Sequence, residues 1–87
     1  MSILSKLFGG GKSAPKPVVY KDYTIFAEPM TESGGFRVAA RIEKEIDGHL
    51  KTHHMIRADT YGSQDTALEA SISKAKNLID QQGDAIF

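Results

Sequence analysis

Three histidines in the second half of the chain are the side chains best suited to metal binding. His49, His53 and His54 lie in a stretch that is typical of a β-strand. Residues on a strand alternate between two faces and advance by about 3.3 Å each, so His53 and His54 point in opposite directions and His49 lies ~13 Å from His53. The chain has no cysteine, which removes thiolate ligands and cysteine nucleophiles. We therefore expect no metal and no other cofactor.

Two carboxylates with strand spacing, Glu43 and Glu45, are the best candidates for acid–base catalysis. Such a pair needs a deep cleft, which a chain of 87 residues is too small to enclose. Cross-strand pairing of either carboxylate with Lys51 is a more ordinary arrangement. The sequence also lacks the strand–turn–helix glycine pattern around a serine nucleophile. We therefore expect a protein that is not an enzyme.

Basic side chains recur in two neighbouring predicted strands, although the charge of the whole chain is balanced. The 11 Lys and Arg residues equal the 11 Asp and Glu residues, which argues against a non-specific nucleic-acid binder. The candidate binding residues are Arg37, Arg41, Lys51, His53 and Arg57. On one exposed sheet face they would form a surface for an acidic partner. The alternative is that they are only the solvated side of a one-sided sheet.

These residues are positioned by three predicted strands, which are rich in β-branched and aromatic residues. The expected bounds are 18–28, 36–45 and 50–58. Lys21-Asp22 indicates a kink in the first strand, and Pro29 either ends this strand or confines it to an edge of the sheet. The second and third strands are joined at Asp47-Gly48, which is a strong hairpin signal. Short connections favour neighbouring positions for successive strands, so the pattern predicts an antiparallel meander.

The length of the second turn decides which side chains share a face. A two-residue turn would place Ile42 beside His53 and split the apolar residues between the faces, which a half-buried sheet disfavours. We therefore predict a three-residue turn at 46–48, with Gly48 in the left-handed conformation. The face under the helix would then hold Val38, Ala40, Ile42, Leu50, Thr52, His54 and Ile56. The open face would hold Arg37, Ala39, Arg41, Glu43, Glu45, Lys51, His53, Met55 and Arg57.

One long helix is expected over 63–82, with Ser63 as its N-cap and Gly83 as its terminator. Its apolar stripe comprises Leu68, Ser71, Ile72, Ala75, Leu78 and Ile79. The apolar C-terminal tail at 84–87 could fold back on the core. The predicted fold class is therefore α+β: a three-stranded antiparallel meander with one long C-terminal helix on one face (β-β-β-α), forming a single domain over 18–87.

Residues 1–17 are expected to form a flexible tail, because a glycine triplet and a Pro-Lys-Pro run favour extended, solvated chain. Residues 9–17 are expected to form the linker part of this tail. Before them, four apolar residues have the spacing of a short amphipathic helix: Ile3, Leu4, Leu7 and Phe8. They are candidates for a weak membrane contact or a partner contact. The apolar run is too short for a secretory signal or a membrane span, so we expect a cytoplasmic protein.

Six sequence blocks resemble a small bacterial family, the HlyU-type proteins labelled as transcriptional activators. They are 2–10 (SILSKLFGG), 20–25 (YKDYTI), 41–48 (RIEKEIDG), 53–60 (HHMIRADT), 74–76 (KAK) and 79–84 (IDQQGD). The resemblance covers nearly the whole chain and implies a role in transcription regulation. It supplies no site residues. The winged-helix regulator of the same name is a different protein, because this sequence has no helix–turn–helix pair.

These observations favour a small cytoplasmic regulator that binds protein partners and has no catalytic activity. One alternative is a peripheral membrane adaptor tethered by the N-terminal amphipathic segment. The other is a direct nucleic-acid binder that uses the ribbon 36–57. The identity of the partner and the oligomeric state are not specified by the sequence.

Overall fold

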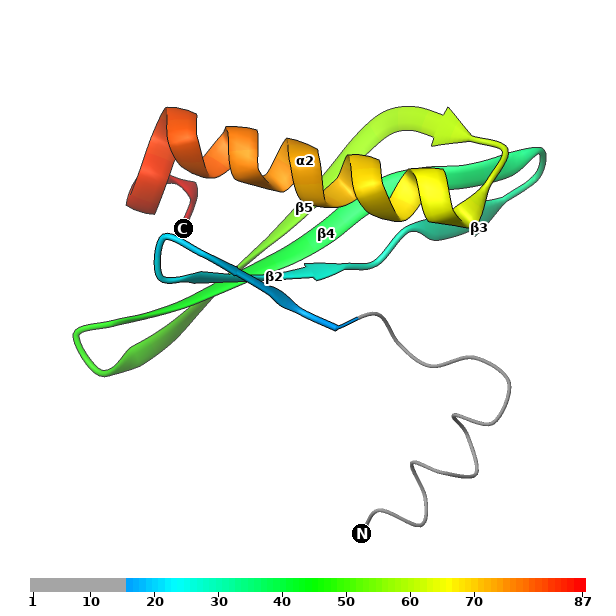
Figure 1. The fold of residues 1–87 in the computed structure, drawn as a ribbon. Helices are drawn as coiled ribbons and strands as arrows, with labels where there is room; N and C mark the ends of the chain where they lie inside the picture. Colours follow the sequence, from blue (N-terminus) through cyan, green and yellow to red (C-terminus); the bar gives the residue numbers. More distant parts are fainter. Residues whose placement is uncertain (1–15) are drawn as a thin grey trace, which may run out of the picture.

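The computed structural model describes residues 16–87, and it has an antiparallel sheet with one long helix across one face (Figure 1). The strands are β1 (Val18–Tyr20), β2 (Tyr23–Ala27), β3 (Met30–Glu32), β4 (Gly35–Ile46) and β5 (His49–Tyr61). They are followed by α2 (Gln64–Gln82) and a short 3-10 helix, η1 (Gly83–Ile86). The α+β class and the C-terminal helix are confirmed. The prediction of three strands is wrong, because the sheet has five.

The first additional strand arises at Lys21-Asp22, which is a turn and not a kink. Both residues have positive φ, 51° and 71°, as the two-residue hairpin turn of type I′ requires. Tyr20 is consequently paired with Tyr23, and β1 folds back along β2. The predicted strand 18–28 is thus a hairpin, with β1 at the edge of the sheet.

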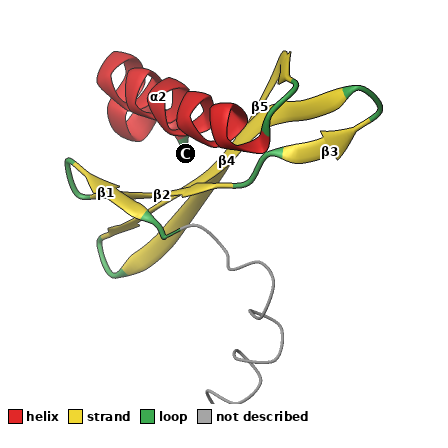
Figure 2. Cartoon of the chain, turned by 45° about the vertical axis from the view of Figure 1, so that its right-hand side comes forward, coloured by secondary structure: helices red, strands yellow, loops and turns green. Residues whose placement is uncertain are grey.

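The second additional strand, β3, follows Pro29. Pro29 interrupts the pairing with β4, but the chain continues along β4 in the same direction beyond it. β2 pairs with residues 40–43 of β4, and β3 then pairs with residues 35–37 of the same strand. Figure 2 shows β1 and β3 at opposite ends of this layer. β4 therefore has β2 and β3 in succession on one side and β5 on the other.

The hairpin between β4 and β5 has a two-residue turn, so the predicted three-residue turn is wrong. Asp47 and Gly48 have φ of 54° and 80°, and Ile46 is paired directly with His49. The same register pairs Ile42 with His53. The local preference of Asp-Gly for a type I′ turn therefore outweighs the matching of apolar faces.

The position of the helix explains why this register is acceptable. α2 lies mainly over β4 and β2 and makes fewer contacts with β5. The core beneath it is drawn from β2, β4 and α2, and the fully buried side chains of greatest volume are Ile25, Ile42, Val38 and Ser71. Met55 is the one buried residue of β5. An edge strand that the helix barely covers needs no continuous apolar face.

The pairing of β4 with β5 is irregular between Arg37 and Ala39, and Ser71 of α2 forms a hydrogen bond to the backbone there. The buried hydroxyl of Ser71 accepts a hydrogen bond from the backbone N–H of Ala39 at 3.2 Å. The same hydroxyl donates to the carbonyl of Ala67 at 2.7 Å. Ser71 therefore satisfies a backbone donor of β4 where the strand pairing is irregular, which is why a polar residue occupies the middle of the buried stripe.

Both ends of the helix follow the sequence prediction. The Ser63 side chain accepts from the backbone N–H of Thr66, and Gly83 has a φ of 56° with its N–H directed to the carbonyl of Ile79. The stripe is shifted slightly from the prediction, with Ile72 only partly buried. The buried helix residues are Ala67, Ser71, Ala75, Leu78 and Ile79.

Two tyrosine–aspartate–lysine contacts connect the end of α2 and the following η1 to β1, its turn, β2 and β4. Asp80 accepts hydrogen bonds from Tyr20 and Lys21. Asp84 accepts from Tyr23 and Lys44. These hydrogen bonds lower the pKa of both carboxyl groups. The pKa of the Tyr23 phenol is raised, mainly because the side chain is buried and secondly because it donates to Asp84.

The C-terminal segment also folds back on the core, as predicted. Ile86 is buried. The ring of Phe87 stacks on Tyr23 with centroids 6.1 Å apart. The chain end therefore closes the core beneath the last turn of the helix.

Candidate protein-binding edge and groove

The five predicted binding residues do not share one face, because the two-residue turn reverses the faces of β5. Arg41 is paired with His54, and Lys44 is paired with Lys51. Directly paired residues share a face. Lys51, His53 and Arg57 therefore lie on the helix side, whereas Arg41 lies on the open side. The predicted placement of these residues on a single open face is wrong.

The two arginines of β4 are engaged by neighbouring carboxylates. Arg37 binds Glu32 on β3. Arg41 bonds to Glu28 at 3.1 Å and to Glu43, and its guanidinium lies 4.0 Å from the ring centroid of Phe26. The positive charge of Arg41 on the open face is therefore neutralised by Glu28 and Glu43, so this face has little attraction for an acidic partner.

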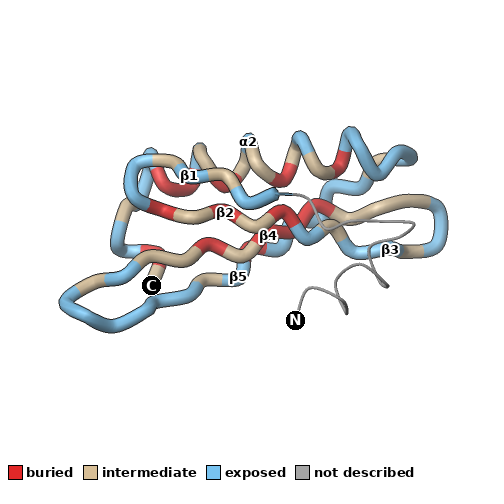
Figure 3. The backbone as a smooth tube through the Cα atoms, turned by 60° about the horizontal axis from the view of Figure 1, so that its bottom comes forward, coloured by how far each residue is buried: buried red, intermediate tan, exposed pale blue. Residues whose placement is uncertain are grey.

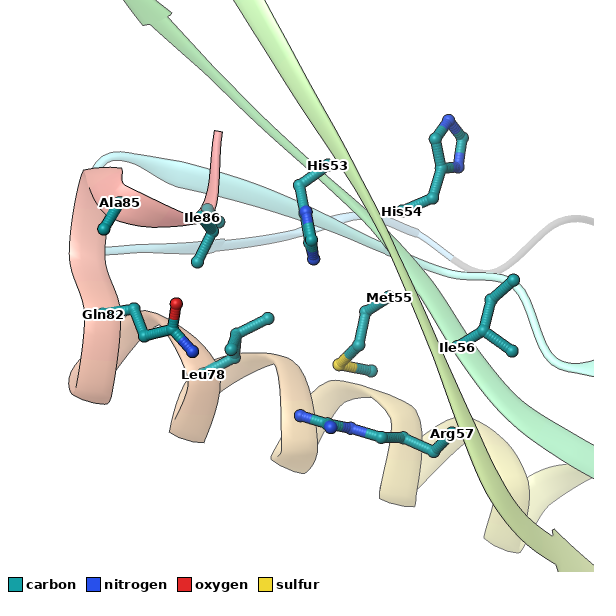
Figure 4. Close-up of a pocket in the computed structure, with 9 residues that line it drawn as sticks. All are labelled: His53, His54, Met55, Ile56, Arg57, Leu78, Gln82, Ala85 and Ile86. Atoms are coloured by element: carbon teal, nitrogen blue, oxygen red, sulfur yellow. The ribbon is translucent and has the colours of Figure 1, made fainter.

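The basic residues of β5 are in a different environment. No carboxylate of the described residues lies within ion-pair distance of Lys51, His53 or Arg57. Figure 4 shows His53, Met55 and Arg57 directed from β5 towards α2, with His54 and Ile56 directed away. The predicted burial of His54 under the helix is therefore wrong, since it is exposed.

A shallow groove runs between β5 and α2, and His53 and Arg57 form part of the wall on the β5 side. It consists of two adjoining hollows of about 350 Å³ and 270 Å³, which meet at Arg57 and Leu78. Carboxamide side chains from the helix form much of the other wall: Asn77, Gln81 and Gln82. One end of the groove is crossed by an ion pair of 3.1 Å between Lys74 and Asp59. The groove thus combines a Met55–Leu78 floor with polar walls and an unneutralised arginine.

The outer edge of β5 borders this groove, and no strand of residues 16–87 pairs with it. In a two-residue hairpin the residues that flank the turn form a hydrogen-bonded pair, and bonded and non-bonded pairs then alternate. His49 and every second residue after it therefore direct their backbone groups to β4. The residues that direct N–H and C=O groups outward are Leu50, Thr52, His54 and Ile56.

The side chains of these outward-bonding residues lie on the open face of the sheet. Two of them are large apolar residues with much of their surface in solvent, 65 % for Leu50 and 58 % for Ile56. Figure 3 shows β5 as mostly exposed along its length, next to the more buried β4. A strand added to this edge would thus meet cations on one face and apolar groups on the other.

Several groove residues were not identified from the sequence. Met55 was expected on the open face, and the helix carboxamides carried no signal because exposed glutamines and asparagines are common on helices. The Asp47-Gly48 pair was the available signal for the β5 side chains, since a type I′ turn there places His53, Met55 and Arg57 on the helix side. The helix wall depends on packing that no local pattern encodes.

Other candidates from the sequence lie outside the groove. Ile3, Leu4, Leu7 and Phe8 lie outside the described residues. In the described part of the chain, 16–87, no three His, Asp or Glu side chains come together as a metal site would require. No helix in that part is long and apolar enough to span a membrane.

Comparison with known proteins identifies the family of this chain. A family model described as "Transcriptional activator HlyU" matches residues 2–87. The chain therefore belongs to the HlyU family, in agreement with the resemblance of its sequence blocks. No curated protein and no solved structure matches it.

Proposed function

We propose that this member of the HlyU family is a non-catalytic, cytoplasmic regulator that acts on transcription by binding a partner protein along the outer edge of β5. The family description supports a role in transcription regulation, which also favours the cytoplasm as its location. The net charge of zero favours protein contacts over phosphate contacts as the main source of affinity. DNA would then be reached through the partner.

The observation that carries the proposal is the exposure of β5. This strand has 13 residues, of which only Met55 is buried, and its outer edge is open in the described part of the chain. A long open edge is a template for another strand unless the fold covers it. β-Strand addition is a common mode of peptide recognition, in which the main chain provides affinity and alternate side chains provide specificity.

The groove supports the same mode of binding. In such complexes, every second side chain of the added strand needs a place beside the sheet. The hollows along β5 and α2 provide that place on the helix side. Nucleic acid has no alternating N–H and C=O groups to complement the β5 edge, so the backbone geometry favours a polypeptide.

A test of the proposal uses the chain in its own cells, with gene deletion and complementation. Thr52→Pro removes one outward N–H, and proline is tolerated where the N–H of an edge strand faces solvent. Thr52→Ala is the matched control, because it alters the same side chain and keeps the N–H. We expect the proline variant to be folded by circular dichroism and to fail to restore the wild-type transcript profile, which the alanine variant restores.

Photo-crosslinking locates the partner in the same strain. A photoreactive amino acid at position 54, beside the edge, is expected to capture one protein in the wild-type background. The same group at position 65, at the exposed start of the helix, is expected not to capture it. Restoration of the transcripts by a folded Thr52→Pro variant, together with equal capture at both positions, would contradict the proposal.

A further inference from the structure

We infer that the strand accepted by β5 is acidic on one face: it carries carboxylates at alternate positions facing Lys51, His53 and Arg57, and neutral apolar residues on its other face. This inference rests on the proposed function, because it specifies the partner of the same edge. Its basis is the different chemistry of the two faces that a strand on β5 would meet.

The groove side of the edge is cationic and lacks a neutralising carboxylate among the described residues. Lys51 and Arg57 are exposed and His53 is partly exposed. The one carboxylate in the lining of the groove, Asp59, is bonded to Lys74. Charge complementarity on this side therefore selects acidic side chains, and a guanidinium in particular binds carboxylates through two parallel hydrogen bonds.

The open side of the edge has the opposite preference. The residues that point there, Leu50, Thr52, His54 and Ile56, include two exposed aliphatic side chains. Beyond them, Arg41 is already bonded to Glu28 and Glu43. Cross-strand neighbours on this side gain most from β-branched or other apolar residues. The accepted strand must therefore alternate acidic and apolar residues with period two.

A second copy of the chain fits this edge less well. The antiparallel arrangement that pairs all four outward-bonding residues is centred on His53, so each His53 faces its equivalent. Both copies would then bring Lys51 and Arg57 to the same seam, where like charges repel. The charge of the edge therefore favours an acidic partner over self-pairing.

The probe is a capped peptide with the order Glu-Val-Ala-Thr-Glu-Val-Glu, which aligns antiparallel with residues 57 to 51 and places its acids towards the groove. The reversed order tests parallel addition. One control has the same composition in the order Glu-Glu-Glu-Val-Thr-Val-Ala, and a second has Gln in place of each Glu. Titration into the full chain by NMR detects millimolar binding and maps the amides that change.

We expect an alternating peptide to bind at least about tenfold more tightly than the same-composition control, with shift changes along 50–56. Arg57→Glu should weaken this binding by about tenfold or more, and binding should weaken as salt rises. Lys16→Glu introduces the same charge change at an exposed site outside the groove and should leave the affinity unchanged. A Lys-for-Glu version of the peptide should bind Arg57→Glu better than it binds the wild type.

The outcomes separate this inference from the proposed function. If the Gln peptide binds at 50–56 as tightly as the Glu peptide, strand addition stands and the acidic partner is wrong. If the same-composition control equals the alternating peptides, the period-two requirement is wrong. If no peptide shifts the amides of 50–56, both proposals fail.

Two further results would also overturn the inference. The first is a dimer in sedimentation equilibrium that Thr52→Pro dissociates, because the edge would then belong to a second copy. The second is tighter binding of a single-stranded oligonucleotide than of any peptide, with loss of that binding in Arg57→Glu.

N-methylation of the peptide tests the contribution of its backbone. Methylation of the alternate amides that face β5 should abolish binding, whereas methylation of the other alternate amides should not.

Discussion

β4 and β5 are neighbouring strands of almost equal length, yet they contribute differently to the molecule. β4 is paired on both sides and covered by the helix, and it supplies Val38, Ala39, Ala40 and Ile42 to the buried residues. β5 is paired on one side and supplies only Met55. The comparison shows that position in the sheet, more than strand length, decides whether a strand is buried in the core or remains exposed.

The charged residues follow the same division. The cations of β4 are engaged within the fold: Arg37 by Glu32, Arg41 by two carboxylates and Lys44 by Asp84. On β5, Lys51 and Arg57 have no such partner among the described residues. Changes in β4 should therefore affect the free energy of unfolding, and changes in β5 should affect binding.

The largest expected effect is on the aliphatic residues of the two strands. Ile42→Ala should lower the free energy of unfolding by about 2–5 kcal/mol, because it opens a cavity at a fully buried site. Ile56→Ala should change it by about 0.5 kcal/mol or less, since that side chain is largely exposed. Urea denaturation measures both values, and Ile42→Val gives a milder change if the alanine variant does not fold. Equal losses at the two positions would remove the distinction between the strands.

A smaller effect is expected at the irregular pairing of β4. Ser71→Ala leaves the N–H of Ala39 without its acceptor, which should cost about 1–3 kcal/mol. Ser73→Ala is the control, because Ser73 is exposed on the same helix. Hydrogen exchange should also accelerate at Ala39 in the Ser71 variant. Unchanged exchange there would mean that the hydroxyl does not protect this backbone donor.

Substitution of Gly48 in the turn that joins β4 and β5 should lower the free energy of unfolding by a similar or smaller amount than Ser71→Ala. Gly48 has a φ of 80°, and a Cβ at this position would meet no atom within 4 Å, so Gly48→Ala is penalised by conformation and not by a clash. We expect a loss of about 1 kcal/mol. Gly62→Ala also meets no atom within 4 Å and lacks a positive φ, so its cost should be lower. A stabilising Gly48→Ala substitution would contradict the two-residue turn and hence the side-chain placement on β5.

The smallest expected effect concerns pH, because it involves exposed groups at the end of the helix. Hydrogen bonds from Lys21 and Tyr20 lower the pKa of Asp80 below its usual value of 3.8. A carboxyl with a lowered pKa in the folded state stabilises the fold above its unfolded pKa, and this contribution is lost as pH falls. Stability should therefore be flat above about pH 5 and decline below about pH 4.

Asp80→Asn tests this origin of the acid sensitivity. The variant should be slightly less stable at pH 7 and should lose less stability than the wild type between pH 5 and pH 3. Because Asp80 contacts β1 and its turn but not β5, peptide binding at the β5 edge should be unaffected. An unchanged pH profile would show that the ion pair contributes nothing measurable, as is common for exposed pairs.

Much of the fold followed from local sequence signals alone. The N-cap serine, the apolar stripe and Gly83 defined the helix, because capping and 3.6-residue periodicity depend only on near neighbours. The β-branched runs identified the strand regions for the same reason. The sequence blocks also determined the family, and the residue types excluded a thiolate metal site. The cations of the candidate site were identified by type, although not by location.

The tertiary structure decided which of those cations are available and where they point. Two features depended on whether the preference of the turn or the burial of apolar side chains prevails: the hairpin at Lys21-Asp22 and the register of β5. Which side chains are buried depends in turn on the position of α2. Because the helix lies mainly over β2 and β4 and buries only Met55 of β5, little apolar burial opposed the register that the Asp47-Gly48 turn favours. The same placement of the helix created the groove beside Arg57. Side-chain chemistry is local and can be read along a chain, whereas the neutralisation of one arginine and the exposure of another depend on contacts between residues far apart in sequence.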